Sequence, residues 1–252
     1  VVRGHADLEA SFAAWNAPAP MDPETQAMIA KSKVNRQRHE RETKRRDDSW
    51  VTFIERLRAH PEELDNLLPQ TKDTADSRLI GLYRFLTSRI SGRSRYSISD
   101  LSTVEPILGT ELTAKFGQAL MKFARQHTPL VGPERSETPN QTSSFDVMGL
   151  AGMSLAAARP GWLQGADRAE FERAARYALF EINGFPDYFL GLAVAHPDAV
   201  RPILEAAVSA QLDGGAPDGH GMLDRLAYAD PALGALISPL LMQRMVASDL
   251  HP

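Results

Sequence analysis

The chain has 252 residues, of which 43% are hydrophobic and 24% are charged, and its formal net charge is -4. This composition is that of a folded protein large enough to bury a core, and it excludes a disordered chain. The slightly acidic charge balance argues against a dedicated nucleic-acid-binding protein, because such proteins usually carry a basic excess. The sequence contains no cysteine, which excludes disulfides, thiol nucleophiles and cysteine-ligated metals and fits a reducing cytoplasm.

The sequence contains no apolar run of the roughly 18 residues that a membrane-spanning helix needs, and no signal peptide opens it. We therefore expect a cytoplasmic protein without membrane contact. The first residue is Val1 rather than methionine, and the sequence after it is typical of a chain interior. We expect the chain to be a segment of a longer protein.

The first region, residues 1–22, is predicted to form a helix followed by a loop. A second helix is expected to begin where Pro23 follows Asp22, because proline is favoured at the first helical position and aspartate can cap it. Residues 31–48 are highly charged, mixed in sign, and contain nothing large and apolar after Val34. Such a helix cannot pack as an ordinary core helix. We expect one long charged helix that is exposed or packed against a partner.

This helix belongs to a predicted region, residues 23–130, that also contains helical hairpins. Apolar residues recur at helical spacing within residues 77–90 and 111–127. Residues 131–144 are rich in proline, glycine and polar residues, and we expect them to form a flexible loop. The one candidate for a β-strand is the short segment 94–98.

The last region, residues 145–252, is predicted to form C-terminal helical repeats. Within residues 167–182 the apolar positions form one stripe at a period of 3.6 residues. Asn183 and Gly184 are expected to end this helix, because glycine readily adopts the left-handed conformation of helix ends. A second glycine-rich loop is predicted at residues 211–221.

An internal similarity indicates repeated helical hairpins. Residues 53–61 align with residues 189–197, since both begin with phenylalanine and end in Ala-His-Pro. Residues 229–231, Ala-Asp-Pro, are a shorter version of the same ending. Stacked hairpins form an α-solenoid, in which each unit buries its apolar stripe against its neighbours. The sequence predicts an all-α fold, and it leaves open an irregular αα-hairpin repeat (a HEAT-like solenoid) or a helical bundle.

Sequence motifs with a known chemistry are missing or lack their structural context. The chain contains no GxxxxGK loop and no strand-led GxGxxG, so we expect no nucleotide site. Ser154 lies in a sequence that distantly resembles a nucleophile elbow, but the elbow needs a preceding strand. The small residues around it, Gly149 and Gly152, indicate close helix packing instead. The histidines lack metal-binding spacing, and His60 and His196, each before a proline, are interpreted as structural.

Three aromatic residues, Trp50, Trp162 and Tyr188, are predicted to lie at or beside helix starts and to hold helix corners. The sequence therefore predicts no catalytic residue, no cofactor and no metal site.

One basic cluster is a candidate contact site for a nucleic acid or another partner; it comprises Arg36, Arg38, Arg41, Lys44, Arg45 and Arg46. Nearby acidic residues dilute it, and mixed charge weakens the long-range field that attracts nucleic acid. Glu40 with Lys44, and Glu42 with Arg46, have the favoured order for ion pairs four residues apart on a helix. An exposed, solvated helix is the favoured interpretation, and phosphate contact is the alternative.

Several motifs follow one another in the chain: Gly149-Leu-Ala-Gly152, Pro160-Gly-Trp162, the stretch from Ala174 to Tyr188, and His196-Pro197. They resemble the helical-repeat region of large bacterial NACHT/STAND-type NTPases, which look like conflict or antiviral-defence proteins. The resemblance covers residues 31–212. The charged helix ending at Trp50 and residues 108–129 fit the same layout. The resemblance implies a sensor or scaffold array attached to an ATPase whose nucleotide site lies outside this chain. These are packing motifs, and no functional residue is carried over with them.

The predicted function is therefore that of a non-enzymatic helical scaffold or sensor segment. Its expected partners are another protein or neighbouring domains of a longer parent chain. A nucleic-acid-contacting helical repeat that uses residues 31–46 is the alternative. A third, weaker alternative is an all-α enzyme whose metal ligands converge from distant helices.

Overall fold

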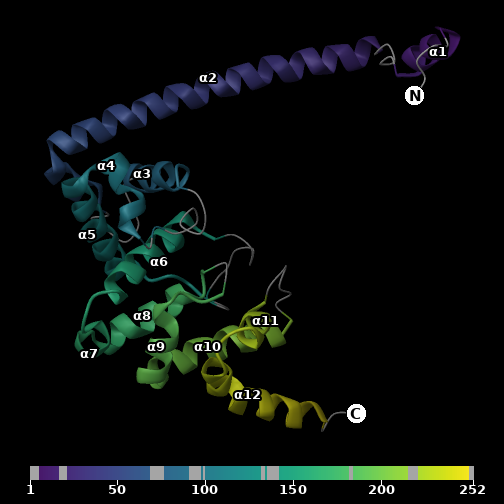
Figure 1. Cartoon of the computed structure of the whole chain (residues 1–252). Helices are drawn as coiled ribbons and strands as arrows, with labels where there is room; N and C mark the ends of the chain where they lie inside the picture. The colour runs from purple at the N-terminus through teal and green to yellow at the C-terminus, as the bar shows by residue number, and fades with distance from the viewer. Residues whose placement is uncertain are drawn as a thin grey trace. The chain divides into compact units, whose positions relative to one another are not determined.

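The computed structural model describes residues 6–16, 22–68, 77–90, 98, 100–131, 134, 142–181, 184–214 and 221–249. Every regular element among these residues is a helix, as Figure 1 shows. The all-α prediction is confirmed. Most of the candidate strand (residues 94–97), most of the predicted loop 131–144, and residues 215–220 of the second loop lie outside the described residues.

The chain divides into two units, Val1–Val51 and Thr52–Pro252. The first unit contains α1 (Ala6–Asn16) and most of α2 (Pro23–Ala59). The predicted start of α2 is confirmed, because Oδ1 of Asp22 accepts a hydrogen bond from the Thr25 amide at 2.8 Å and Oδ2 accepts one from the Thr25 hydroxyl at 2.6 Å. These bonds favour the charged carboxylate and lower the pKa of Asp22.

The long charged helix differs from the prediction in two respects. It does not end at Trp50 but continues to Ala59, because the following turns carry an apolar stripe whose Ile54 and Leu57 are buried. Trp50 therefore lies inside a helix and not beside a helix start. Glu42 forms its ion pair with Arg38 at 2.9 Å, and not with the predicted partner four residues ahead.

The second unit begins with the end of α2 and continues through shorter helices. They are the 3₁₀ helix η1 (Pro61–Leu67), α3 (Ser77–Thr87), the 3₁₀ turn η3 (Leu101–Thr103), α4 (Glu105–Leu108), α5 (Thr110–Gln126), α6 (Ser144–Ala157), α7 (Trp162–Gly165), α8 (Arg168–Ala178), α9 (Tyr188–Ala195), α10 (Pro197–Leu212), α11 (Met222–Ala227) and α12 (Pro231–Asp249).

The longer helices of this unit pack in succession. Helix α5 packs on α6, α6 on α8, α8 on α10, and α10 on α12. In the part of the chain that the structure describes, no extensive contact joins α5 to α10 or to α12. The shorter α9 fills in beside α8, α10 and α12. Contacts between neighbours only are typical of stacked helical repeats, so this order favours the repeat over a closed bundle.

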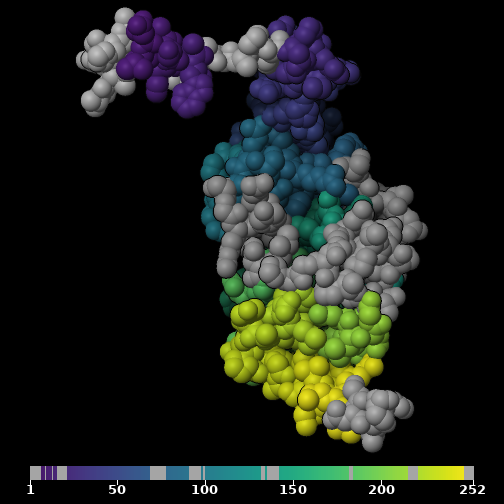
Figure 2. Space-filling model, turned by 90° about the vertical axis from the view of Figure 1, so that its right-hand side faces the viewer, coloured from purple at the N-terminus to yellow at the C-terminus, as the bar shows by residue number. Residues whose placement is uncertain are grey.

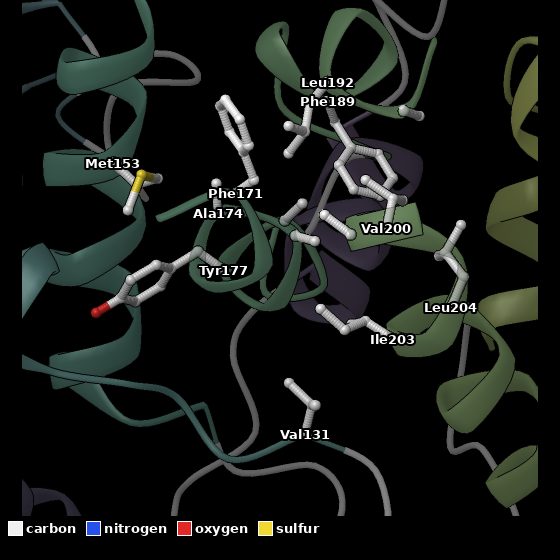
Figure 3. Packing of buried hydrophobic residues seen from close by; sticks show 14 of the residues in the cluster. Val131, Met153, Phe171, Ala174, Tyr177, Phe189, Leu192, Val200, Ile203 and Leu204 are labelled. Atoms are coloured by element: carbon white, nitrogen blue, oxygen red, sulfur yellow. The ribbon is translucent and has the colours of Figure 1, made fainter. Parts of the chain in front are cut away.

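The core of the stack is centred on α8. Figure 3 shows Phe171, Ala174 and Tyr177 of α8 lying between Met153 of α6 on one side and the side chains of α9 and α10 on the other. Residues Phe189, Leu192, Val200, Ile203 and Leu204 form that second side. All nine are buried, which removes apolar surface from water on both faces of the helix. A single amphipathic helix thereby joins two successive layers.

The two Ala-His-Pro turns have the same backbone geometry. His60 has φ and ψ of -135° and 69°, and His196 has -134° and 60°. Each histidine amide closes the preceding helix, His60 on Arg56 at 2.9 Å and His196 on Leu192 at 2.8 Å. The following helices differ, however, because residues after Pro61 form a 3₁₀ helix and residues after Pro197 form α10. The internal similarity therefore repeats the turn and not the whole hairpin.

Small residues in α6 permit close helix packing, as predicted. A Cβ atom on Gly152 would lie 2.1 Å from the carbonyl oxygen of Leu120, and one on Gly149 would lie 2.2 Å from the Tyr177 ring. Ser154 lies inside α6, and that helix begins directly after the Ser143 cap rather than after a strand. The context of a nucleophile elbow is therefore missing at Ser154. None of the helices within the described ranges has the length and apolar character that crossing a membrane requires.

Candidate functional site

The six predicted contact residues all lie on exposed turns of α2; they are Arg36, Arg38, Arg41, Lys44, Arg45 and Arg46. Successive residues of a helix are rotated by about 100°, so these side chains point to several faces and converge on no single point. Across residues 31–46 there are eight lysine and arginine residues and two glutamates, which is a net charge of +6 in a chain of -4. The segment is thus an exposed basic rod, and its role as a contact site stays a prediction.

A histidine–carboxylate pair is the first arrangement that could be a catalytic site. Nε2 of His127, at the end of α5, lies 3.0 Å from Oδ1 of Asp146, a buried carboxylate on α6. The Tyr177 hydroxyl donates to the His127 carbonyl oxygen at 3.0 Å, and the Phe123 ring stacks on the imidazole. Burial, followed by the charge of Asp146, raises the pKa of the Tyr177 hydroxyl far above its ordinary value, which keeps it a neutral hydrogen-bond donor.

This cluster serves packing rather than catalysis. Its bonds join α5, α6 and α8, and neither pocket described below is lined by His127, Asp146 or Tyr177. A general base needs a reacting group within hydrogen-bond reach, and no described pocket would bring one to this imidazole.

The other predicted structural residues behave as anchors. Nε2 of His196 lies 2.8 Å from the carbonyl oxygen of Leu163, and its ring stacks on Phe171 at 3.9 Å. That carbonyl belongs to α7, so the imidazole joins two helices while the His196 amide ends α9. Trp162 starts α7 and donates from Nε1 to Glu170 at 2.9 Å, while the Tyr188 hydroxyl, at the start of α9, donates to the Ala174 carbonyl at 2.9 Å. Both aromatic residues hold corners, as predicted.

Metal-ligating side chains do not gather anywhere within the described ranges: no group of three or more histidine, aspartate or glutamate residues could hold an ion there. A site of this class normally needs three or four such ligands converging on one point.

One hollow of the second unit was not predicted from the sequence. It has a volume of about 550 Å³ and is lined by residues 184–187 and Leu190, by Asp224 and Arg225, and by residues 228–230 and Leu233. These residues come from the approach to α9, from α9 itself, from α11 and from the start of α12. We call it the α9–α11–α12 pocket. The surfaces of α10, α11 and α12 lie together at the yellow end of the colour range in Figure 2.

Arg225 forms the inner wall of this pocket and ends α8. Its guanidinium donates to the carbonyl oxygens of Leu179 at 2.8 Å and Ala178 at 3.0 Å, and also to that of Gly184. It lies over the Phe185 ring, 4.5 Å from the ring centre. Burial lowers the pKa of Arg225 to about 10, so the group is still charged at neutral pH.

This arginine corrects the predicted end of the helix. The helix expected over residues 167–182 ends at Ala178, and residues Leu179 to Glu181 turn with short-range hydrogen bonds instead. The last carbonyl groups of a helix lack partners within it, and Arg225 supplies those partners from far along the chain. Gly184 does adopt the expected left-handed φ, at 108°, although it lies beyond the helix end.

The outer part of the pocket is acidic and aromatic. Asp187, Asp224 and Asp230 line it, all three are exposed, and none pairs with a cation within the described residues. Oδ1 of Asp230 accepts the Ala232 amide at 2.9 Å at the start of α12, so this carboxylate is partly engaged. Tyr228 stands at the same rim with 93% of its surface exposed. The pocket residues come from three helices that are separated in the sequence, so the sequence alone could not show that they lie together. The one part that it indicated is the turn before Pro231.

A second, smaller hollow of about 310 Å³ lies between α8 and α10. Its charged residues are already matched, since Arg176 binds Glu134 with two hydrogen bonds and Arg168 pairs with Glu172 at 2.8 Å. The bond from Arg176 lowers the pKa of Glu134. The α9–α11–α12 pocket is therefore the better candidate for a binding site, because its carboxylates have no cationic partner.

The chain matches no protein-family model, no curated protein and no solved structure. The resemblance to NACHT/STAND-type proteins thus stays an expectation that rests on its sequence motifs.

Proposed function

We propose that the chain is a non-enzymatic helical scaffold that binds protein, either a separate macromolecule or other domains of a longer parent chain. The observation that carries the proposal is Tyr228, a large aromatic side chain that is 93% exposed at the rim of a 550 Å³ pocket. Tyrosine is enriched among the residues that dominate binding energy at protein interfaces, since it combines a large apolar ring with a hydroxyl group. A pocket beside it offers the partner a place to anchor.

The fold supports the same proposal. Helices stacked in succession present a long surface, as helical-repeat proteins do when they bind other proteins. The His127–Asp146 pair, the Tyr177 hydroxyl and the His196 imidazole of the described core form hydrogen bonds between helices, so packing accounts for them. By the resemblance of its motifs, we place this scaffold in the cytoplasm as a sensor or scaffold segment of a large bacterial defence NTPase.

The proposal predicts partner binding that depends on Tyr228. A display library of fragments from the source genome would be selected on the immobilised chain, and the affinity of each enriched fragment measured by interferometry. We expect Tyr228→Ala to weaken binding by at least about tenfold, as loss of an interface anchor worth roughly 1.4–3 kcal/mol does. Leu130→Ala removes another exposed apolar side chain, one that lines neither pocket, and should bind normally. If no fragment is enriched, or if both variants bind equally, the proposal is wrong.

The basic rod of α2 supports a second candidate function, contact with nucleic acid. Its net charge of +6 over residues 31–46 is stronger than the mixed composition first indicates. Phosphate contacts release counterions, so binding of duplex DNA would weaken steeply with salt. Replacing Arg36, Arg38 and Arg41 together by glutamine should then reduce the slope of log affinity against log salt by roughly 3. Fluorescence anisotropy between 50 and 200 mM salt, roughly the range over which such slopes are read, measures it.

The matched control replaces three exposed cations of the second unit, Lys122, Arg159 and Arg201, by glutamine. It changes the net charge of the chain by the same amount and should leave the slope unchanged. A wild-type slope near zero, or an equal effect of both triple variants, would remove nucleic acid as a function of the rod.

A further inference from the structure

The α9–α11–α12 pocket has the construction of a site for a long side chain with a charged end. Its apolar walls are Phe185, Leu190 and Leu233, and its outer part carries the exposed carboxylates of Asp187 and Asp224. A volume of about 550 Å³ is within the range of roughly 300–1,000 Å³ that binding pockets occupy. An occupant that lies across the pocket would therefore place an apolar stem on these walls and a polar end beside the exposed carboxylates.

The charge at the mouth is negative although Arg225 lies within the pocket. The guanidinium faces three backbone carbonyl oxygens and the Phe185 ring, so its donors are directed into the protein. Its Nε is buried and has no partner in the described structure, which places that donor out of reach of an occupant. The carboxylates of Asp187 and Asp224, in contrast, form no ion pair with a cation of the described residues.

We propose that this pocket receives the side chain of an arginine or lysine from a protein partner. The proposal rests on the proposed function, that the chain binds protein, and it names the chemistry of the residue that the pocket takes. The methylene stem of such a residue would lie along Leu190 and Leu233, and its cationic end would meet Asp187 and Asp224. Long basic side chains commonly bury their stems while their charged ends stay among polar groups.

Tyr228 adds a second attraction for the same kind of occupant. An exposed aromatic ring attracts a cation placed over its face, by about 0.5–1 kcal/mol at an exposed site. An acidic partner residue would meet only carboxylates at the mouth and would be repelled. A neutral apolar residue would fill the walls but would leave the two carboxylates without a partner. A basic residue is the one class that satisfies walls, mouth and ring together.

The test uses the full chain and three short alanine peptides that differ only in a central arginine, citrulline or glutamate. Citrulline keeps the shape of arginine and lacks its charge. Titrations followed by amide NMR should show saturable shifts at residues 184–190 and 224–233 for the arginine peptide. Because one exposed ion pair contributes up to about 1 kcal/mol, we expect affinity up to about fivefold lower for citrulline, and no saturation for glutamate.

The matched variants change charge equally. Asp187→Asn with Asp224→Asn should lower the affinity for the arginine peptide to that of the citrulline peptide. Asp65→Asn with Asp198→Asn alters two exposed carboxylates that do not line the pocket and should change nothing. Neither Asp187 nor Asp224 caps a helix through its side chain, so the first variant should stay folded, which the same spectra would verify.

The outcomes separate the two proposals. Equal binding of the arginine and citrulline peptides, or tighter binding of the glutamate peptide, overturns the basic-residue inference. In that case, library fragments whose binding depends on Tyr228 would still support the proposed function of protein binding. Binding of the arginine peptide at the pocket, with no fragment enriched from the library, would support the basic-residue site and overturn the proposed function.

Discussion

Replacing Gly152 by alanine is expected to destabilise the chain strongly, because no space is available for the added methyl group. Its Cβ would lie 2.1 Å from the carbonyl oxygen of Leu120 and 2.5 Å from the carbonyl carbon. Both atoms belong to the backbone of α5, so the two helices must move apart. Overpacking of a core costs about 1–3 kcal/mol and more against backbone, and alanine's helix propensity returns about 1 kcal/mol.

We therefore expect a net loss of about 2 kcal/mol, which lowers the thermal midpoint by roughly 4–8 °C in a chain of this size. Circular dichroism at 222 nm, the usual helix wavelength, would follow unfolding, and failure to recover folded protein counts in the same direction. Gly191→Ala is the matched control, since Gly191 lies inside α9 and its Cβ would meet only the Leu163 side chain at 3.6 Å. It should stabilise slightly. If Gly152→Ala unfolds no earlier than this control, α5 and α6 do not approach as described.

Arg225→Met is the second substitution with a large expected effect. It keeps a flexible apolar stem and removes the donors that bind the carbonyl groups of Ala178, Leu179 and Gly184. Hydrogen bonds to charged groups contribute about 1.5–3 kcal/mol each. Part of that is recovered, because a buried charge is removed and the neighbouring pocket admits water to the freed carbonyls. A net loss of about 2 kcal/mol, or roughly 4–8 °C, is the expected result.

The loss should be local as well as global. Hydrogen exchange followed by mass spectrometry should show faster exchange in residues 178–181 and 184–186, next to the released carbonyls, than in α5. Arg201→Met, on the exposed face of α10, is the matched control and should change stability by no more than about 0.5 kcal/mol. Equal melting of the two variants would show that Arg225 does not hold the end of α8.

Local sequence rules located most of the helices. Asp22 caps the helix that it was expected to start, and the period-3.6 stripe of α8 does form the core face. The small residues of α6 were correctly assigned to close packing. These features depend on neighbours within a few residues, and such neighbours are visible in one sequence.

The errors came from interactions between distant segments. The early end of α8 depends on Arg225, which is separated from Leu179 by 46 residues. Trp50 was placed at a helix boundary because the charged run stops there. Helix α2 continues beyond it because Ile54 and Leu57 are buried in the core. The α9–α11–α12 pocket could not be found for the same reason, since Asp187 and Asp224 become neighbours of one hollow only through folding.

The order in which the helices of the second unit pack also has a consequence for how this unit comes apart. Because each layer is supported mainly by the layers on either side of it, melting need not be all-or-none and can travel inward from a terminal layer, as in a one-dimensional chain of coupled units. Among the described helices, α12 packs on α10 and on the small helices α9 and α11. An occupant of the pocket would touch α9, α11 and α12 at once, and it would therefore stabilise the attachment of α12 to this layer against local opening.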